Sequence, residues 1–282
     1  MNVLGMVDYE VGSMAETRKF APGDDLLEWV QKDNRRFVHA VYRVGDIDRA
    51  IKFYTECFGM KVLRKRDFPE EKYSTAALGF GLEKSHFVVE LIYSDNIYMV
   101  ERRSLQMVLK PIPKLDVGVC FVLRVILKAT VGSSSRMAST PEPLCQIMLR
   151  VADLDLSIKF YEQALGMKLL LKYDNPRENY TMAMVGYGEM NETTVLELIY
   201  TYNVTEYTKG NGFVEVAVST DDVYKSAAAV LLVIKELGGK IIQPPGPIPV
   251  INTKMTSFVN PDDWKIVLID NEDFLKQLQK KE

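Results

Sequence analysis

The spacing of apolar and polar residues predicts a compact αβ unit near the start of the chain. Apolar residues alternate with polar ones in four runs, and between the first two runs they recur at helical spacing. Asp46 is a suitable N-cap for the helix and Gly59 a suitable end. The predicted elements are a strand at 37–44, a helix between Asp46 and Gly59, and strands within 60–67, 74–80 and 86–93. The unit is therefore βαβββ.

The same unit occurs a second time. Residues 43–93 align without a gap with residues 150–200, and about half of the aligned positions are identical. The first strand of the second copy is predicted at 145–151. An internal repeat of this length indicates duplicated structural modules.

A third unit of the same order is predicted over residues 212–271. It has a strand at 212–220, a helix over 221–239, a turn at 244–249 and later strands, the last of which follows a Pro-Asp pair. Symmetry would place a fourth unit between Ser94 and about Thr140, but that stretch is shorter and shows neither the helix start nor the Pro-Asp pair. An atypical module, altered splicing and a gene-model error are all open explanations.

These units predict an α+β fold of tandem βαβββ modules that form curved mixed sheets with helices on their outer faces. The expected organisation is an N-terminal extension with a lead-in helix at 1–34, an N-terminal domain at 35–137 that is atypical from 94, and a C-terminal domain at 138–282.

Composition narrows the class of protein. The formal net charge is −3 and charges of both signs are mixed, which does not favour nucleic-acid binding. Three cysteines at irregular spacing predict neither a disulfide framework nor a thiolate zinc site. The N-terminus does not resemble a secretory signal, and no apolar run approaches the ~20 residues of a membrane span. We expect a cytoplasmic protein with no membrane partner.

Four polar residues occupy matching strand positions in the two copies. Side chains two apart on a strand share a face, so His39 and Glu90 can meet across a curved sheet, as can Gln146 and Glu197. Imidazole nitrogen, amide oxygen and carboxylate suit a divalent ion such as zinc, nickel or cobalt. The alternative is an interior histidine with glutamates paired to nearby Arg or Lys. Their repetition at inward positions favours metal ligands, because buried polar groups without partners are costly.

Arginines follow four residues after each first ligand position. Arg43 and Arg150 could hold an anionic substrate group by a bidentate contact, and a salt bridge across the sheet is an almost equal alternative. The basic run Arg64 to Arg66 is more typical of solvated surface than of a binding patch.

Several motifs together resemble a known family. HAVYRVGDIDRAIKFYTECFGMKVLRKRD, TPEPLCQIMLRVADLD, VLELIYTYNVTEYTKGNG and NPDDWKIVLIDN are similar to glyoxalase I (lactoylglutathione lyase), in the fused two-domain form of plants within the vicinal oxygen chelate superfamily. The resemblance covers roughly residues 25–95 and 138–282. It implies isomerisation of the methylglyoxal–glutathione hemithioacetal to S-lactoylglutathione in methylglyoxal detoxification, with glutathione as co-substrate and Ni²⁺ or Zn²⁺ as metal.

The resemblance also implies how each metal site is assembled. One module supplies His39 and Glu90, or Gln146 and Glu197, and the second module of the other half supplies two more ligands. In the C-terminal second module Glu215 stands at the expected His position.

Val267 stands at the expected Glu position, which leaves His39, Glu90 and Glu215 as three ligands with water. Glu90 and Glu197 are the expected catalytic bases. We expect a monomer, because the fused two-domain form supplies within one chain the modules that a dimer would supply between two chains. A non-catalytic protein that binds metal or a glutathione conjugate is the alternative function.

Overall fold

The computed structural model describes residues 26–70, 72–94, 123–125, 144–190, 192–248 and 252–279. The sequence shows no fourth unit in residues 94–140. Of this stretch, the structure describes only Ser94 and one short strand, β5 (Leu123–Val125). No helix within the described ranges is long and apolar enough to span a membrane.

The first two units have the predicted element order, and the α+β fold class is confirmed. A short helix, α1 (Leu26–Lys32), precedes the first unit. The first unit consists of β1 (Phe37–Arg43), α2 (Ile47–Phe58), β2 (Lys61–Phe68), β3 (Tyr73–Gly79) and β4 (Val88–Ser94). The second consists of β6 (Leu144–Arg150), α3 (Leu154–Leu165), β7 (Lys168–Asn175), β8 (Tyr180–Gly186) and β9 (Val195–Thr201).

Local chemistry sets the ends of both repeated helices. The Asp46 carboxylate accepts a hydrogen bond from the Arg49 amide, so it caps the N-terminus of α2. The C-cap of α2, Gly59, has a left-handed φ of 70°. In α3 an aspartate cap and a left-handed glycine occupy the same two places. Both helix boundaries are therefore encoded by residues that the repeat preserves.

The third unit consists of β10 (Phe213–Thr220), α4 (Val223–Leu237), β11 (Lys240–Pro247), β12 (Lys254–Val259) and β13 (Lys265–Asp270). The prediction of a turn at 244–249 was wrong at its start, because Pro244 to Pro247 belong to β11. Prolines are tolerated there because β11 is the edge strand of its sheet and its register with β12 is irregular. A final helix, α5 (Asn271–Gln279), follows without having been predicted.

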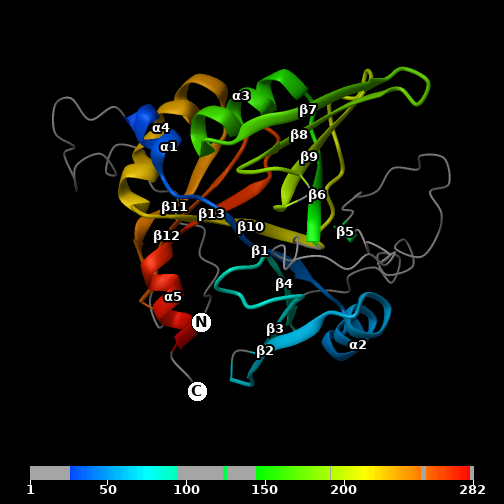
Figure 1. The fold of residues 1–282 in the computed structure, drawn as a ribbon, viewed down its shortest axis with the longest axis vertical. Helices are drawn as coiled ribbons and strands as arrows, with labels where there is room; N and C mark the ends of the chain where they lie inside the picture. Colours follow the sequence, from blue (N-terminus) through cyan, green and yellow to red (C-terminus); the bar gives the residue numbers. More distant parts are fainter. Residues whose placement is uncertain are drawn as a thin grey trace, which may run out of the picture.

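The first and third units form one eight-stranded sheet, in the order β11-β12-β13-β10-β1-β4-β3-β2. The junction is the antiparallel pairing of β1 with β10, in which Val41 lies opposite Glu215 and His39 opposite Ala217. In Figure 1, α1, α3 and α4 gather on one side of the molecule and α2 lies at the opposite end. The sheet thus unites the two parts of the chain that the sequence assigned to separate domains.

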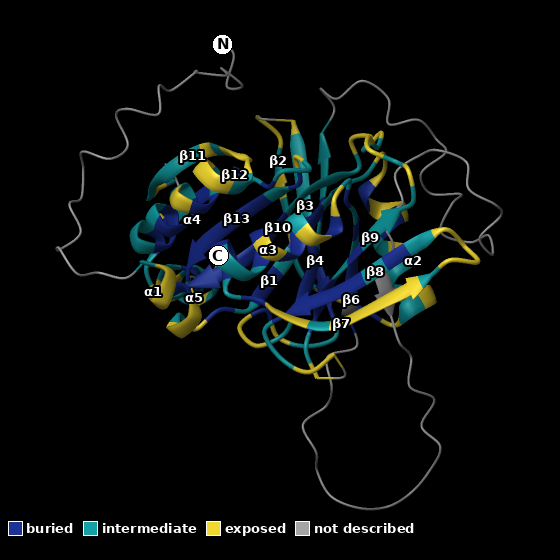
Figure 2. Ribbon diagram, turned by 90° about the horizontal axis from the view of Figure 1, so that it is seen from above, coloured by how far each residue is buried: buried dark blue, intermediate teal, exposed yellow. Residues whose placement is uncertain are grey.

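The second unit forms its own sheet with the short strand, in the order β5-β6-β9-β8-β7. β5 pairs antiparallel with β6, as β10 does with β1. Figure 2 shows β10, β13, β1 and β6 buried at the centre, whereas β7 lies exposed at an edge. The core is continuous, because buried side chains of all three units belong to one apolar cluster.

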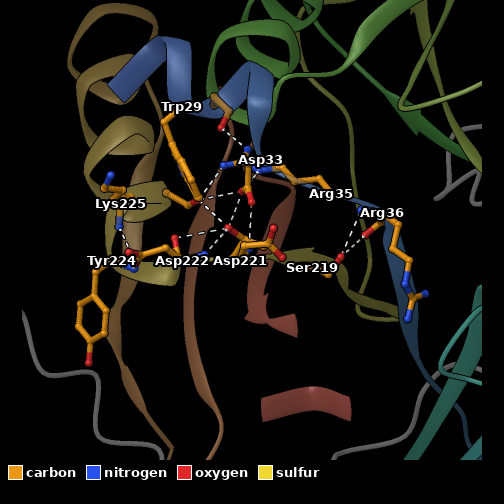
Figure 3. A network of polar contacts seen from close by, with 12 residues as sticks. Trp29, Asp33, Arg35, Arg36, Ser219, Asp221, Asp222, Tyr224 and Lys225 are labelled. Atoms are coloured by element: carbon orange, nitrogen blue, oxygen red, sulfur yellow. Dashed lines mark hydrogen bonds and ion pairs between the residues drawn. The ribbon is translucent and has the colours of Figure 1, made fainter. Parts of the chain in front are cut away.

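A buried ion pair ties the N-terminal segment to the other two units (Figure 3). The Arg35 guanidinium lies 2.6 Å from the Asp33 carboxylate, and both side chains are fully buried. Arg35 also donates to the Ala164 carbonyl of the second unit and to the Ser226 hydroxyl on α4. Asp33 accepts from the Asp221 amide. The pair therefore has hydrogen-bond partners in both the second and the third unit.

We predict that Asp33→Ala lowers the free energy of unfolding by about 3 kcal/mol or more, because it leaves a buried guanidinium without its counter-ion. Urea denaturation measures this. The control is Glu28→Ala, which breaks the exposed ion pair with Lys32 and should cost well under about 1 kcal/mol. Equal losses in the two variants would contradict the role assigned to Asp33.

Candidate metal and substrate site

The candidate ligands of the first unit and of the third unit lie on one face of the eight-stranded sheet. Parallel pairing places Val41 opposite Glu90, and antiparallel pairing places Val41 opposite Glu215. Directly opposite residues share a face, so Glu90 and Glu215 flank β1 on the side to which His39 also points. This convergence exists only because β1 pairs with β10.

These side chains line a cavity of about 720 Å³. His39, Glu90 and Glu215 contribute imidazole and carboxylate groups. Helix α5 closes part of the cavity. The remaining lining residues are mainly charged on β2 and mainly apolar on β12, β13 and α5: Leu63, Arg64, Lys65, Arg66, Glu83, Thr253, Met255, Val267, Ile269, Phe274, Gln277 and Leu278.

The fourth position of the candidate site is apolar. Val267 lies opposite Ala217 on the neighbouring strand and is only 3% exposed. It belongs to a small buried cluster that includes Ile269 and Phe274. No polar atom is available at this place, so the first site has three candidate protein ligands.

Both candidate carboxylates have cationic neighbours. Lys265 Nζ lies 2.8 Å from a Glu215 oxygen. Arg64 Nη2 lies 3.7 Å from Glu90 Oε2 and 3.3 Å from Glu83 Oε2. The ion pairing that the sequence left as an alternative is therefore present for Glu90. Across the described ranges, no group of three or more His, Cys, Asp or Glu side chains is arranged so that it could hold a metal ion.

The donor chemistry nevertheless suits a divalent ion. A neutral imidazole and two carboxylates, all accessible from one cavity, are the N and O donors that zinc and nickel accept. The carboxylates are mostly buried, with side-chain exposures of 16% for Glu90 and 20% for Glu215. A metal ion bound here would replace Lys265 as the counter-ion of Glu215 and Arg64 as the counter-ion of Glu90.

The second copy presents an equivalent half-site on its own sheet. β6 and β9 pair so that Met148 lies opposite Glu197, and Gln146 lies two residues earlier on the same face. The Gln146 amide nitrogen contacts Met184 Sδ at 3.8 Å, while its Oε1 is buried and has no hydrogen-bond partner among the described residues. Buried acceptors normally have a partner. An incoming cation would supply one.

Arg43 and Arg150 were expected either to bind substrate or to form a salt bridge across the sheet. Among the described residues, neither arginine forms such a salt bridge. Arg43 Nη1 donates to the Asn211 carbonyl at 2.8 Å. The Arg150 guanidinium lies over the Tyr207 ring, 5.7 Å from its centroid. Both arginines therefore keep a formal positive charge that no carboxylate among these residues neutralises.

The assignment of Arg64 and Arg66 to solvated surface was wrong, because both residues line the cavity. Side chains alternate along β2, and Arg64 and Arg66 lie two residues apart, so their side chains share a face. Lys65 also contributes to the cavity wall, but its ammonium group pairs with Asp48 of α2. The same alternation, applied to the basic run, could have identified the two arginines. Glu83 and Lys265 carried no signal of this kind, because their contacts come from a loop and a distant strand.

We predict that Gln146→Leu leaves the free energy of unfolding unchanged or raises it by up to about 1 kcal/mol, because it removes a buried acceptor that finds no partner in the part of the chain that the structure describes. Urea denaturation tests this. The control is Asn260→Leu, which should destabilise the fold, because Asn260 Oδ1 accepts from the Trp264 and Asp262 amides. A loss above about 1 kcal/mol for Gln146→Leu would show a structural role for the amide.

Comparison with protein families gives an independent result. The chain matches the Glyoxalase/Bleomycin resistance protein/Dioxygenase superfamily over residues 36–100 and 144–268. These ranges contain the first two units, the third unit up to residue 268 in β13, and every candidate ligand named above.

Individual relatives agree with the family match. A lactoylglutathione lyase of Oryza sativa subsp. japonica is 53% identical, with 90% of this chain and 96% of the relative covered. The lactoylglutathione lyase GLX1 of Arabidopsis thaliana is 51% identical, with 92% and 100% covered.

Among solved structures, glyoxalase I from Zea mays superposes with a TM-score of 0.75 at 50% identity, with 89% of this chain and 98% of the maize chain covered. The fold, the repeated modules and the matches over nearly the whole length lead to one conclusion. The chain belongs to the glyoxalase superfamily and, within it, to the lactoylglutathione lyase family.

Proposed function

We propose that this protein is a metal-dependent lactoylglutathione lyase that isomerises the methylglyoxal–glutathione hemithioacetal to S-lactoylglutathione. One observation carries the proposal: His39, Glu90 and Glu215, from the two ends of the chain, line one 720 Å³ cavity. A cavity of this size accommodates a substrate the size of a tripeptide adduct. The identity to lactoylglutathione lyases over nine-tenths of the chain supports the same reaction.

In this proposal His39, Glu90 and Glu215 hold Ni²⁺ or Zn²⁺ at the first site, and Gln146 with Glu197 hold it at the second. Bound there, the ion would supply Lewis-acid polarisation of the substrate oxygens. The second site also needs ligands from residues outside the described ranges. At either site, water completes the shell where the chain supplies fewer than four ligands.

The carboxylates of Glu90 and Glu197 are the proposed bases. The base takes the proton from C1 of the hemithioacetal and returns it to C2, while the C1 hydroxyl proton passes to the C2 oxygen. No atom is gained or lost, so the thiohemiacetal becomes a thioester and the ketone becomes an alcohol. Arg43 and Arg150 would hold carboxylates of the glutathione part by charge-assisted hydrogen bonds.

A second candidate function has a specific observation in its favour. Val267 occupies the place of a fourth ligand and is packed among apolar side chains. A chain with incomplete sites could bind metal or a glutathione conjugate without turnover.

We further propose that the protein works in the cytoplasm as a monomer. Cys57 is a free, exposed thiol, which is typical of a reducing compartment. Both partners of the β1–β10 junction belong to the same chain.

We predict that purified protein loaded with Ni²⁺ or Zn²⁺ forms the thioester from methylglyoxal and glutathione. The absorbance of the thioester measures its formation. Glu90→Ala combined with Glu197→Ala should lower kcat by about 10² or more, because both sites then lose their base. The matched control is Glu56→Ala, an exposed carboxylate on α2 that should have no effect. No activity with any metal, or activity that survives both substitutions, would contradict the proposal. Bound metal without turnover would favour the second candidate function.

The protein should behave in solution as a monomer of 32.1 kDa. The physical reason is that the eight-stranded sheet is completed within one chain. Light scattering coupled to size-exclusion chromatography measures the mass, and a mass of twice this value at micromolar concentration would contradict the prediction.

A further inference from the structure

The carboxylate of Glu90 has a cation beside it that reaches across a neighbouring strand. Arg64 on β2 pairs with Ala77 on β3, and Ala77 pairs with Glu90 on β4, so the three residues form one row across the sheet. Adjacent strands are about 4.8 Å apart, and the small side chain of Ala77 leaves room for the guanidinium to pass over it. Arg64 Nη2 consequently lies 3.7 Å from Glu90 Oε2.

The guanidinium is anchored by a different carboxylate. Arg64 Nε and Nη2 donate to the two oxygens of Glu83 at 3.4 and 3.3 Å. The Glu83 side chain is only 9% exposed, and Arg36 donates to the Glu83 backbone carbonyl at 3.0 Å. At 3.7 Å the contact with Glu90 is longer than a hydrogen bond, so Arg64 acts on Glu90 mainly through its charge.

The second copy lacks all three members of this arrangement. Leu171 stands at the position of Arg64, Met184 at the position of Ala77, and Met190 at the position of Glu83. The strand register is the same, since Leu171 pairs with Met184 and Met184 with Glu197. The cation, its anchor and the small residue between the strands are thus replaced together, while the glutamate itself is retained.

We propose that Arg64, anchored by Glu83, is a positioning residue that holds a positive charge beside Glu90 and thereby weakens the affinity of the first half-site for a divalent cation. This inference rests on the proposed metal site and adds a difference between its two copies. A fixed guanidinium repels a cation that approaches Glu90, and in a half-buried cavity this repulsion is poorly screened. In the second copy the corresponding positions beside Glu197 hold Leu171 and Met184, so they supply no guanidinium.

The test exchanges the charged pair for the pair that the second copy contains. Arg64→Leu with Glu83→Met is introduced into full-length protein that also carries Glu197→Ala, which silences the other half-site. Isothermal titration of the metal-stripped protein with NiCl₂ alone measures Kd. The exchange removes one charge of each sign, so the net charge of the cavity is unchanged, but Glu90 loses the guanidinium that contacts it. Kd should tighten by about tenfold, because the cation no longer competes with this guanidinium for the Glu90 carboxylate.

Two control variants test whether the change in Kd comes from removing the positive charge beside Glu90. Arg64→Lys keeps the charge and should leave Kd close to its starting value. Lys52→Leu removes an exposed charge from α2, where Lys52 lies near Glu56 and does not line the cavity, and should also leave Kd unchanged. The unfolding midpoint of each variant in urea verifies that it is folded, and the apolar pair is one that the second copy already contains.

An unchanged or weaker Kd in the exchanged variant would overturn the proposal, as would absence of nickel binding both with and without the exchange. The proposed function is tested separately by turnover of the unmodified chain, so the two can fail independently.

Discussion

The antiparallel pairing of β1 with β10 is the constraint on which the rest of the structure depends. It joins the first unit to the third across more than 160 intervening residues and makes one eight-stranded sheet from both. Such a junction places a large loop-closure cost on folding, which is offset by burying the apolar faces of both units in one core. The register of this one pair also decides which side chains meet in the cavity.

The buried pair Asp33 and Arg35 supports the same junction from its N-terminal side. The two residues immediately precede β1, and their hydrogen bonds go to the start of α4 and to the end of α3. Desolvating two charges is costly, so this pair requires the full set of partners that it has. Its geometry determines how the helices of the second and third units lie against the start of the central strand.

The repeated unit, its helix boundaries and the shared face of His39, Glu90 and Glu215 follow from capping residues, strand alternation and strand pairing. The assignment of these three residues as metal ligands stays a prediction. Asp46 and Gly59 bound α2 through capping chemistry alone, and alternation showed which strand residues share a face. The distant residues Lys265 and Glu83 were missed, since their contacts with Glu215 and Arg64 depend on sheet order and on a loop. The run at Pro244 was assigned to a turn because only an edge position makes proline compatible with a strand.

We propose that ligands from the two ends of the chain hold one metal ion between β1 and β10. Anomalous diffraction from a nickel-saturated crystal tests this proposal. We expect a peak in the cavity at about 2.0–2.2 Å from a nitrogen of His39 and from carboxylate oxygens of Glu90 and Glu215. A map without a peak between these two strands, at saturating nickel, would contradict it.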